Sequence, residues 1–310
     1  MTKRSRSSNA LGFLILGVLV IGGVASGLML TWPLITGESH DPDAESVETI
    51  DDTKKVEEPK FPAEINFQPA IDEWAKTVSG NKSILIYDLA LNKTVGEYNI
   101  SENYNTASLY KLFVVYEGYK RVYTGEWNGE AMTGSTGYTI NKCLDLAIRE
   151  SYSPCAEALW AMIGHESLDK IIKTDWGITN SDILHLTSNV SDITAIMKRF
   201  YLHPDFDDPA MLETMWNSFL NQPKTTYDWR QGLPSGFSSA TVYNKVGWSY
   251  NPDGGYWDIY HDTAIVKFKM PDNTTRDFIV TVMTNKIDFK YIKNFGTMLE
   301  NAFSDFKETL

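Results

Sequence analysis

The sequence predicts an α+β fold, in which an antiparallel sheet is flanked by helices and carries an inserted all-helical lobe. Strand patterns occur at both ends of the region after residue 62, and helical patterns occupy its middle. This order favours one sheet assembled from both ends of the chain over alternating strand–helix units. With 310 residues, 43% of them apolar and 22% charged, the chain is long enough for such a fold and is not of low complexity.

The first segment, residues 1–36, predicts a membrane anchor. Basic residues at positions 3, 4 and 6 precede an uncharged run from Leu11 to Ile35, which is long enough to cross a bilayer as a helix. The basic residues should keep the amino terminus in the cytoplasm, so that the rest of a single-pass protein would lie outside the plasma membrane. The alternative is a signal peptide cleaved near Val24-Ala25-Ser26, which would release a secreted protein. We favour the anchor because the apolar run continues past that point.

Residues 37–62 predict an acidic, disordered linker. Between Gly37 and Lys60 nine acidic residues face three lysines, which accounts for half of the net charge of −12. Such a segment cannot bury enough apolar surface to offset the entropy lost on ordering. The charge of this segment therefore needs no functional explanation.

The remaining segment, residues 63–310, predicts one folded domain whose elements follow in order. A helix at 70–78 precedes strands at 83–89 and 95–100, which are joined by a turn at Leu91-Asn92-Lys93. A helical block then covers 109–119, 143–149, 156–163, 168–174 and 190–201. Strand patterns return at 241–250, 263–270 and 277–284, and a helix at 289–306 closes the domain.

A Ser-x-x-Lys pair at Ser108 and Lys111 is the first feature that could carry chemistry. In a helix this spacing places a hydroxyl and an amine on one face, so that the lysine, if kept neutral, can activate the serine as a nucleophile. The pattern occurs four times in the chain, but only at Ser108 does it open a long apolar helix directly after a strand pair. On spacing alone, a helix-capping serine and an ordinary solvated lysine are the better explanation of the pair.

Two further patterns follow. Ser151-Tyr152-Ser153 lies in a short break between two helices, where a hydroxyl can relay a proton to a leaving group or can simply cap a helix. Lys245-Val246-Gly247 lies inside a strand pattern, where glycine often permits close approach of a ligand. An exposed edge-strand lysine beside a bulge is the alternative explanation for that pattern.

These three patterns, in this order, resemble the motifs of penicillin-recognising serine enzymes, and the flanking text resembles the class A β-lactamase-like family. The resemblance rests on YNTASLYKLFVVYEGY, AIRESYSPCAEALWAMIG, WRQGLPSGFSSATVYNKVGWSY and YHDTAIVKF, and it extends from about Phe67 to Phe306. It implies a sheet-containing region and a helical lobe with an active site between them.

The resemblance also implies a role for each matching residue. Ser108 would be acylated, with Lys111 as its base and Lys245 as a neighbouring cation that lowers the lysine's pKa. Ser151 would pass a proton to the leaving nitrogen. Substrate would be bound by Ser153, Gly247 and Trp248, and the backbone N–H groups of Ser108 and Trp248 would form the oxyanion hole.

Three departures separate the chain from that family. Ser153 stands where the family has Asn, and Val246 stands where it has Thr or Ser, so hydrogen bonds to substrate should be lost. The glutamate that deacylates the enzyme in that family has no counterpart in the loop Asp175–Ser188. Glu166 comes too early in the sequence to be that residue, and we interpret it as an acidic residue that stabilises the start of a helix. Asp182 and His185 are weak candidates for its replacement. We therefore expect acylation to be better supported than rapid turnover.

The sequence leaves open whether Cys143 and Cys155, the only two cysteines, form a disulfide. Outside the membrane a bond between them is permissible and would clamp the Ser151 loop. Two buried free thiols are the alternative.

Composition excludes several other classes of function. The net charge of −12 argues against nucleic-acid binding, and the scattered histidines and two cysteines give no metal-ligand spacing, so we expect no cofactor and no metal. The expected partners are a small-molecule β-lactam or a peptidoglycan stem peptide, with the lipid bilayer contacted through the N-terminal helix, and we expect a monomer. The leading hypothesis is a membrane-anchored extracytoplasmic serine hydrolase. The alternatives are a penicillin-binding DD-peptidase or transpeptidase, and a catalytically inactive binding module on the same fold.

Overall fold

The computed structural model describes residues 63–224, 228–249 and 258–309. The predicted anchor and acidic linker lie outside these ranges and stay predictions. Within the described ranges no helix is both long and apolar enough to cross a membrane.

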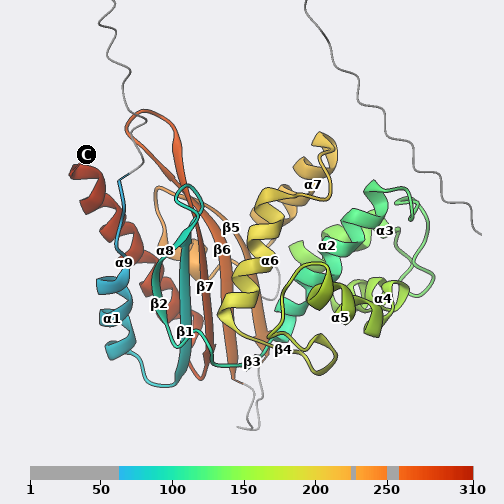
Figure 1. Ribbon diagram of the computed structural model, residues 1–310, viewed down its shortest axis with the longest axis horizontal. Helices are drawn as coiled ribbons and strands as arrows, with labels where there is room; N and C mark the ends of the chain where they lie inside the picture. Colours follow the sequence, from blue (N-terminus) through green and yellow to red (C-terminus); the bar gives the residue numbers. More distant parts are fainter. Residues whose placement is uncertain (1–62, 225–227, 250–257, 310) are drawn as a thin grey trace, which may run out of the picture. The chain divides into compact units, whose positions relative to one another are not determined.

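One five-stranded antiparallel sheet organises the domain (Figure 1). It contains β1 (Asn81–Asp88), β2 (Lys93–Tyr98), β5 (Thr241–Ser249), β6 (Ile259–Lys269) and β7 (Thr275–Asn285), in the order β2-β1-β7-β6-β5. The first hairpin therefore joins the last three strands through β1 and β7, which run antiparallel from Asn81 opposite Asn285 to Asp88 opposite Phe278. The predicted fold class, with its sheet assembled from both ends of the domain, is confirmed.

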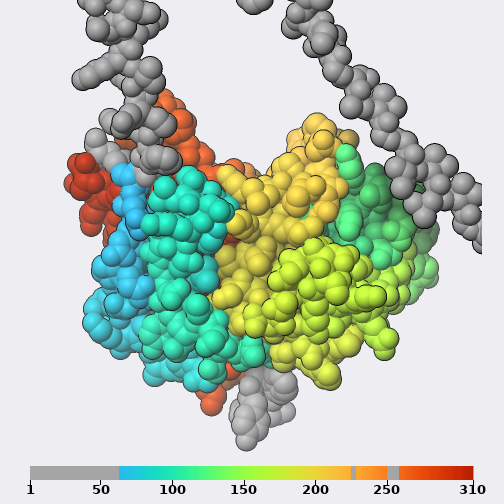
Figure 2. All heavy atoms as spheres, viewed as in Figure 1, coloured from blue at the N-terminus to red at the C-terminus, as the bar shows by residue number. Residues whose placement is uncertain are grey.

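Helices cover both faces of this sheet (Figure 1). One face packs against α1 (Gln68–Thr77), α8 (Leu233–Gly236) and α9 (Phe289–Glu308). The other packs against α6 (Val190–Leu202) and, at β5, against α7 (Pro209–Leu220). The lobe is completed by α2 (Tyr110–Tyr123), which packs on α6, and by α3 (Ile140–Arg149), α4 (Ser153–Ile163) and α5 (His165–Thr174). The space-filling view shows α6 in contact with the β1–β2 hairpin along this junction (Figure 2).

Two apolar cores result, one on each face of the sheet. The first joins the sheet to the helical lobe and includes Phe113, Tyr116 and Phe200. The second lies under α1 and α9 and includes Trp74, Phe278 and Phe303. Strand β7 is buried on both faces along almost its whole length, and its central part, Phe278–Met283, is accordingly apolar on both faces apart from Thr281.

The predicted elements are present, with ends that differ by a few residues, and the structure adds others. The additions are α7, the short α8, two 3₁₀ turns, η1 (Ala107–Leu109) and η2 (Ile183–His185), and a two-stranded pair of β3 (Tyr104–Asn105) with β4 (Thr187–Ser188). Helix α7 begins at Pro209 after a cap in which the Asp208 side chain accepts from the Met211 N–H. Asp208 followed by Pro209 is a sequence pattern typical of a helix start, so the beginning of α7 could have been predicted.

Candidate active site

Ser108 lies in a tight turn that is held from three sides. The turn is η1, which leads directly into α2, and Ala107 before the serine has a φ of 43°. The Asn105 side chain accepts from the Ala107 N–H at 2.9 Å, and the Leu186 carbonyl accepts from the Thr106 N–H at 2.7 Å. A non-glycine residue in left-handed conformation costs roughly 1–3 kcal/mol, so these contacts must hold the turn against strain. Ser108 is not the capping residue of either helix.

The third support is His261, on β6, which sequence reasoning missed. Its Nδ1 accepts from the Thr284 N–H at 2.9 Å, so its Nε2 carries the proton and donates to the Asn105 carbonyl at 2.8 Å. Burial lowers the pKa of His261 to about 4, which keeps the ring neutral at physiological pH. The histidine therefore fixes the chain just ahead of Ser108 through a directed hydrogen bond.

Gly247 lets strand β5 approach this turn. A Cβ atom at Gly247 would lie 2.7 Å from the Thr106 carbonyl oxygen and 2.8 Å from Leu109 Cγ. Gly247 thus permits a close approach of the protein's own chain, and the predicted approach of a ligand stays a prediction. Trp248, the next residue, lies opposite Tyr260 on β6 and packs edge-on against Trp229 at 5.8 Å.

Two buried lysines converge on the loop that bears Ser151 and Ser153. Lys111 on α2 donates to Ser153 Oγ at 2.9 Å and lies 3.4 Å from Ser151 Oγ, and Lys245 on β5 donates to Ser151 Oγ at 2.9 Å. Lys111 is 0% exposed and Lys245 is 1% exposed, so the alternatives of a solvated lysine and an exposed edge lysine are wrong. Ser151 has a φ of 53°, the second left-handed non-glycine residue of the site.

Burial dominates the charge state of both lysines. It lowers the pKa of Lys111 to about 7, and the negative charge of Glu157 opposes this shift only in part. Burial also lowers the pKa of Lys245, and the positive charge of Lys111 adds to that effect. A lysine that loses its proton near neutral pH can act as a base.

The predicted contact between Ser108 and Lys111 is not formed in this structure. Among the described residues the Ser108 side chain makes no hydrogen bond, whereas the Lys111 ammonium is directed to Ser151 and Ser153. Ser108 is half-buried. Hydrogen bonds between nucleophile and base are often long in ligand-free enzymes and shorten when substrate binds.

The two substituted motif positions have different structural roles. Ser153 Oγ provides one of the three acceptors around Lys111, so its hydroxyl positions that lysine. Val246 is 1% exposed and belongs to the core on the α8–α9 face of the sheet. Valine at this position therefore packs in the interior.

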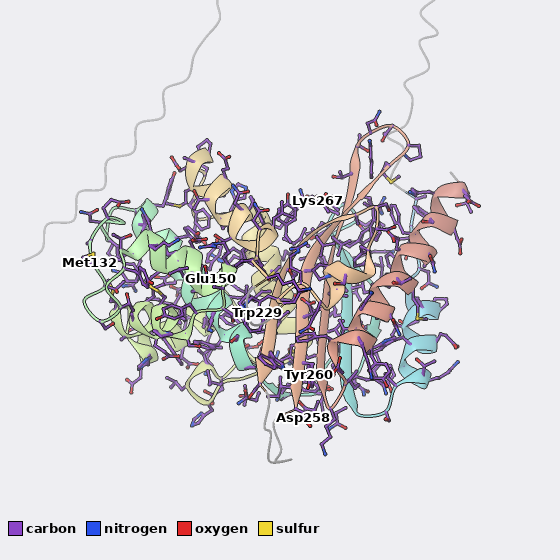
Figure 3. All side chains as sticks on the ribbon, turned by 180° about the vertical axis from the view of Figure 1, so that it is seen from behind. Met132, Glu150, Trp229, Asp258, Tyr260 and Lys267 are labelled. Carbon is purple, nitrogen blue, oxygen red and sulfur yellow. A yellow bond between two sulfur atoms is a disulfide. The ribbon has the colours of Figure 1, made fainter. Side chains whose placement is uncertain are left out.

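Cys143 and Cys155 are joined by a disulfide that links α3 to α4 across the Ser151 loop. The two cysteines are 12 residues apart in sequence, and the link ties the N-terminal part of α3 to the first turn of α4. Figure 3 shows Glu150, which precedes Ser151, on the helical lobe, and Trp229 on the sheet side of the site.

The loop from Asp175 to Ser188 brings no glutamate to the site. Asp182 caps η2 and pairs with His185 at 2.7 Å, but the His185 side chain is 79% exposed. Within the described residues this pair contacts none of the motif residues. The loop instead contributes backbone, through β4 and the Leu186 carbonyl, to the support of the Ser108 turn.

Residues 66–298 match the model of the β-lactamase enzyme family. The chain belongs to this family. Three quarters of the chain also superpose on solved class A β-lactamases at low sequence identity. A variant of the reconstructed enzyme of the last common ancestor of Gram-negative bacteria has a TM-score of 0.64 at 17% identity, with 76% of this chain and 98% of that chain covered. A class A β-lactamase from Bacteroides cellulosilyticus has a TM-score of 0.63 at 13% identity, with 76% and 96% covered.

A third solved relative, a β-lactamase from Xanthomonas campestris, has a TM-score of 0.61 at 14% identity, with 76% and 96% covered. No curated protein sequence matches the chain. At these identities the structures establish a class A β-lactamase fold, with the family's three motif regions of this chain gathered where helical lobe and sheet meet.

Proposed function

We propose that the protein is a membrane-anchored extracytoplasmic serine enzyme, acylated at Ser108 by β-lactams or by D-Ala-D-Ala-type peptides. The observation that carries the proposal is the pair of buried lysines, Lys111 and Lys245, which meet at Ser151 beside the turn that bears Ser108. A fold retained only for binding would have no need to bury two amines together, because each loses hydration there. The basic N-terminus and the apolar run from Leu11 to Ile35 support the anchor.

The chemistry follows from these positions. Neutral Lys111 takes the proton of Ser108, and Oγ attacks the substrate carbonyl carbon. The backbone N–H groups of Ser108 and Trp248 stabilise the developing oxyanion. Ser151, whose oxygen already accepts from Lys245, gives its own proton to the leaving nitrogen and is reprotonated from Lys111. The products of this half-reaction are an ester on Ser108 and a free amine.

A second candidate is a DD-peptidase or transpeptidase that acts on peptidoglycan. The absence of Glu from the loop Asp175–Ser188 favours it, because a peptidase requires acylation and tolerates slow release better than a β-lactamase does.

The deciding experiment is intact-mass analysis of the full-length protein in detergent after exposure to benzylpenicillin. Ser108→Ala serves as the matched control, since it deletes one oxygen at a half-buried position. We expect an adduct of the mass of benzylpenicillin on the wild type only. Hydrolysed penicillin without a persistent adduct would establish β-lactamase turnover. Neither adduct nor hydrolysis would overturn the enzymatic proposal in favour of a binding module.

A further inference from the structure

Release of an acyl group from Ser108 needs a base that can reach water, and this inference rests on the proposed function. The hydroxyls of Ser151 and Ser153 are engaged by the lysines, and the Lys111 amine, neutral again once it has reprotonated Ser151, is 0% exposed and out of reach of solvent. A carboxylate is the remaining group able to take a proton from water at neutral pH.

Two carboxylates act on the lysine pair, Asp262 on Lys245 and Glu157 on Lys111. Asp262 is 0% exposed, and its two oxygens accept from the Leu233 N–H at 2.8 Å and from Asn244 Nδ2 at 2.9 Å. It lies opposite Val246 and so points to the core face of the sheet, away from the serines. Asp262 therefore has neither water nor a free oxygen.

Glu157 has both. It lies on α4 one turn after Ser153, which places the two side chains on the same helix face. Glu157 is exposed, and one carboxylate oxygen accepts from the hydroxyl of Tyr110, the residue directly before Lys111. Among the described residues its other oxygen makes no hydrogen bond, so it is open to a solvent molecule.

The Tyr110 contact also limits where the carboxylate can go. Tyr110 is 5% exposed, its ring packs on Trp160 of the same helix α4 at 5.4 Å, and the Lys111 ammonium lies 5.8 Å from the ring centroid. A hydroxyl on such a fixed ring holds the Glu157 carboxylate near the Lys111 ammonium, whose protonated form its charge favours. An exposed glutamate without this contact would rotate freely in solvent.

We propose that Glu157 is the base that activates the water molecule that hydrolyses the Ser108 acyl-enzyme. The Glu157 carboxylate takes one proton from water while the water oxygen bonds to the ester carbonyl carbon. The tetrahedral intermediate then breaks its bond to Ser108 Oγ, which recovers a proton from the Glu157 carboxyl group. One water is consumed, and a carboxylic acid and free Ser108 result.

This role makes acylation and deacylation respond differently to removal of the carboxylate. The negative charge of Glu157 favours the protonated form of Lys111, so its loss lowers the pKa of Lys111 further and leaves more of the lysine able to act as base. Acylation should therefore persist without Glu157. Deacylation should slow, because the water loses its base.

The test compares the wild type, Glu157→Gln and Glu166→Gln as full-length proteins labelled with benzylpenicillin. After removal of free penicillin, the fraction of adduct is followed by intact mass. Glu166→Gln is the matched control, because it makes the same chemical change in the first turn of the next helix. We expect Glu157→Gln to form the adduct and to lose it about 100-fold more slowly or worse, whereas Glu166→Gln behaves as the wild type.

The outcomes separate this inference from the function on which it rests. An adduct that forms on the wild type and decays equally fast in Glu157→Gln would overturn the role of Glu157 alone. A wild-type adduct that persists for hours would overturn it too, since no base would then be active. Absence of both adduct and hydrolysed penicillin with the wild type would overturn the proposed function together with this inference.

A second variant, Tyr110→Phe, checks the geometry. It removes the hydroxyl that holds Glu157 and keeps the aromatic packing on Trp160. We expect a smaller slowing of deacylation than in Glu157→Gln, with acylation retained. An unchanged decay rate would show that the held position of the carboxylate is irrelevant and would count against the inference.

Discussion

At the scale of single residues, the site depends on amines placed where water cannot solvate them. Lys111 and Lys245 are nearly inaccessible, and among the described residues their hydrogen-bond acceptors are Ser151, Ser153 and the Val246 carbonyl oxygen. Desolvation disfavours the charged amines, so a proton is released at a pH several units below that of an exposed lysine. Burial thus favours a neutral amine, which the proposed activation of Ser108 requires.

The pKa of Lys111 near 7 gives a pH dependence with a definite sign. Only the neutral amine can accept the Ser108 proton, so the second-order rate constant of acylation should rise as pH increases through about 7 and then level off. Below pH 7 the rise should approach about tenfold per pH unit. Stopped-flow measurement with a fluorescent penicillin between pH 5.5 and 8.5 tests this. A constant rate across that range would contradict the assignment of Lys111 as base.

Which of these residues could be predicted from sequence depends on how local their role is. Ser108 and Lys111 share one helical turn, so their relation is visible in the sequence. The support from His261 and the proposed role of Glu157 arise only when β6 packs beside the Ser108 turn and α4 beside α2, and neither residue belongs to a recognisable spacing. The burial of Val246 in the core under α1 and α9 could not be predicted from the sequence either. One residue of a strand cannot be assigned to a face of the sheet until the neighbouring strands are placed.

At the scale of elements, the closest approach in the site is between strand β5 and the turn η1. Gly247 permits that approach, since a Cβ atom there would overlap the Thr106 carbonyl oxygen and the Leu109 side chain. The backbone carbonyl cannot move without loosening the support given by Leu186 and Asn105.

Gly247→Ala should therefore damage both the fold and the site. We expect the free energy of unfolding to fall by about 1–3 kcal/mol. Acylation should slow by at least about tenfold, because a small displacement of the nucleophile is costly. Urea unfolding and penicillin labelling measure the two effects. Gly125→Ala is the control, since it also adds a Cβ at a constrained position, φ 75°, but meets no atom within 4 Å. Equal acylation by both variants would show that the close approach does not position Ser108.

Helices and strands of this domain were largely visible in the sequence, and the exceptions have physical causes. Predicted and observed bounds agree within a few residues for α6, Val190–Leu202, and for β5, Thr241–Ser249. The pair β3–β4 has two residues per strand and exists only because the loop before α6 lies beside the chain leading to Ser108. No periodicity can report so short an element.

At the scale of the whole molecule, the sheet is completed by pairing between strands from distant parts of the chain. Strand β1 pairs with β7, and α1 packs on α9, where the Trp74 ring lies 5.0 Å from that of Phe295 and its Nε1 donates to the Tyr291 carbonyl at 2.8 Å. The first described residues and the end of α9 lie at the same end of the domain (Figure 1). The helical lobe is thus an insertion between two parts of one sheet.

This arrangement predicts that the order of the chain can be changed without loss of the site. A permutant of the folded region would join its two ends by a flexible Gly/Ser linker and begin at Asn273, in the exposed turn between β6 and β7. It should fold to the same sheet order and retain acylation within about threefold of the wild type, because exposed turns tolerate new termini. Circular dichroism and penicillin labelling test this, and a permutant that is unfolded would show that the β6–β7 turn is required to close the sheet.

The hydroxyl of Ser153 has a consequence for how related sequences are found. A search pattern that demands asparagine at the third position of the second motif would discard this chain, although Ser153 Oγ still meets the Lys111 ammonium at 2.9 Å. What the position has to supply is an acceptor within reach of a buried amine, and either an amide or an alcohol provides one. Surveys that define the motif by hydrogen-bonding capacity instead of by residue type will therefore recover members that a literal pattern leaves out.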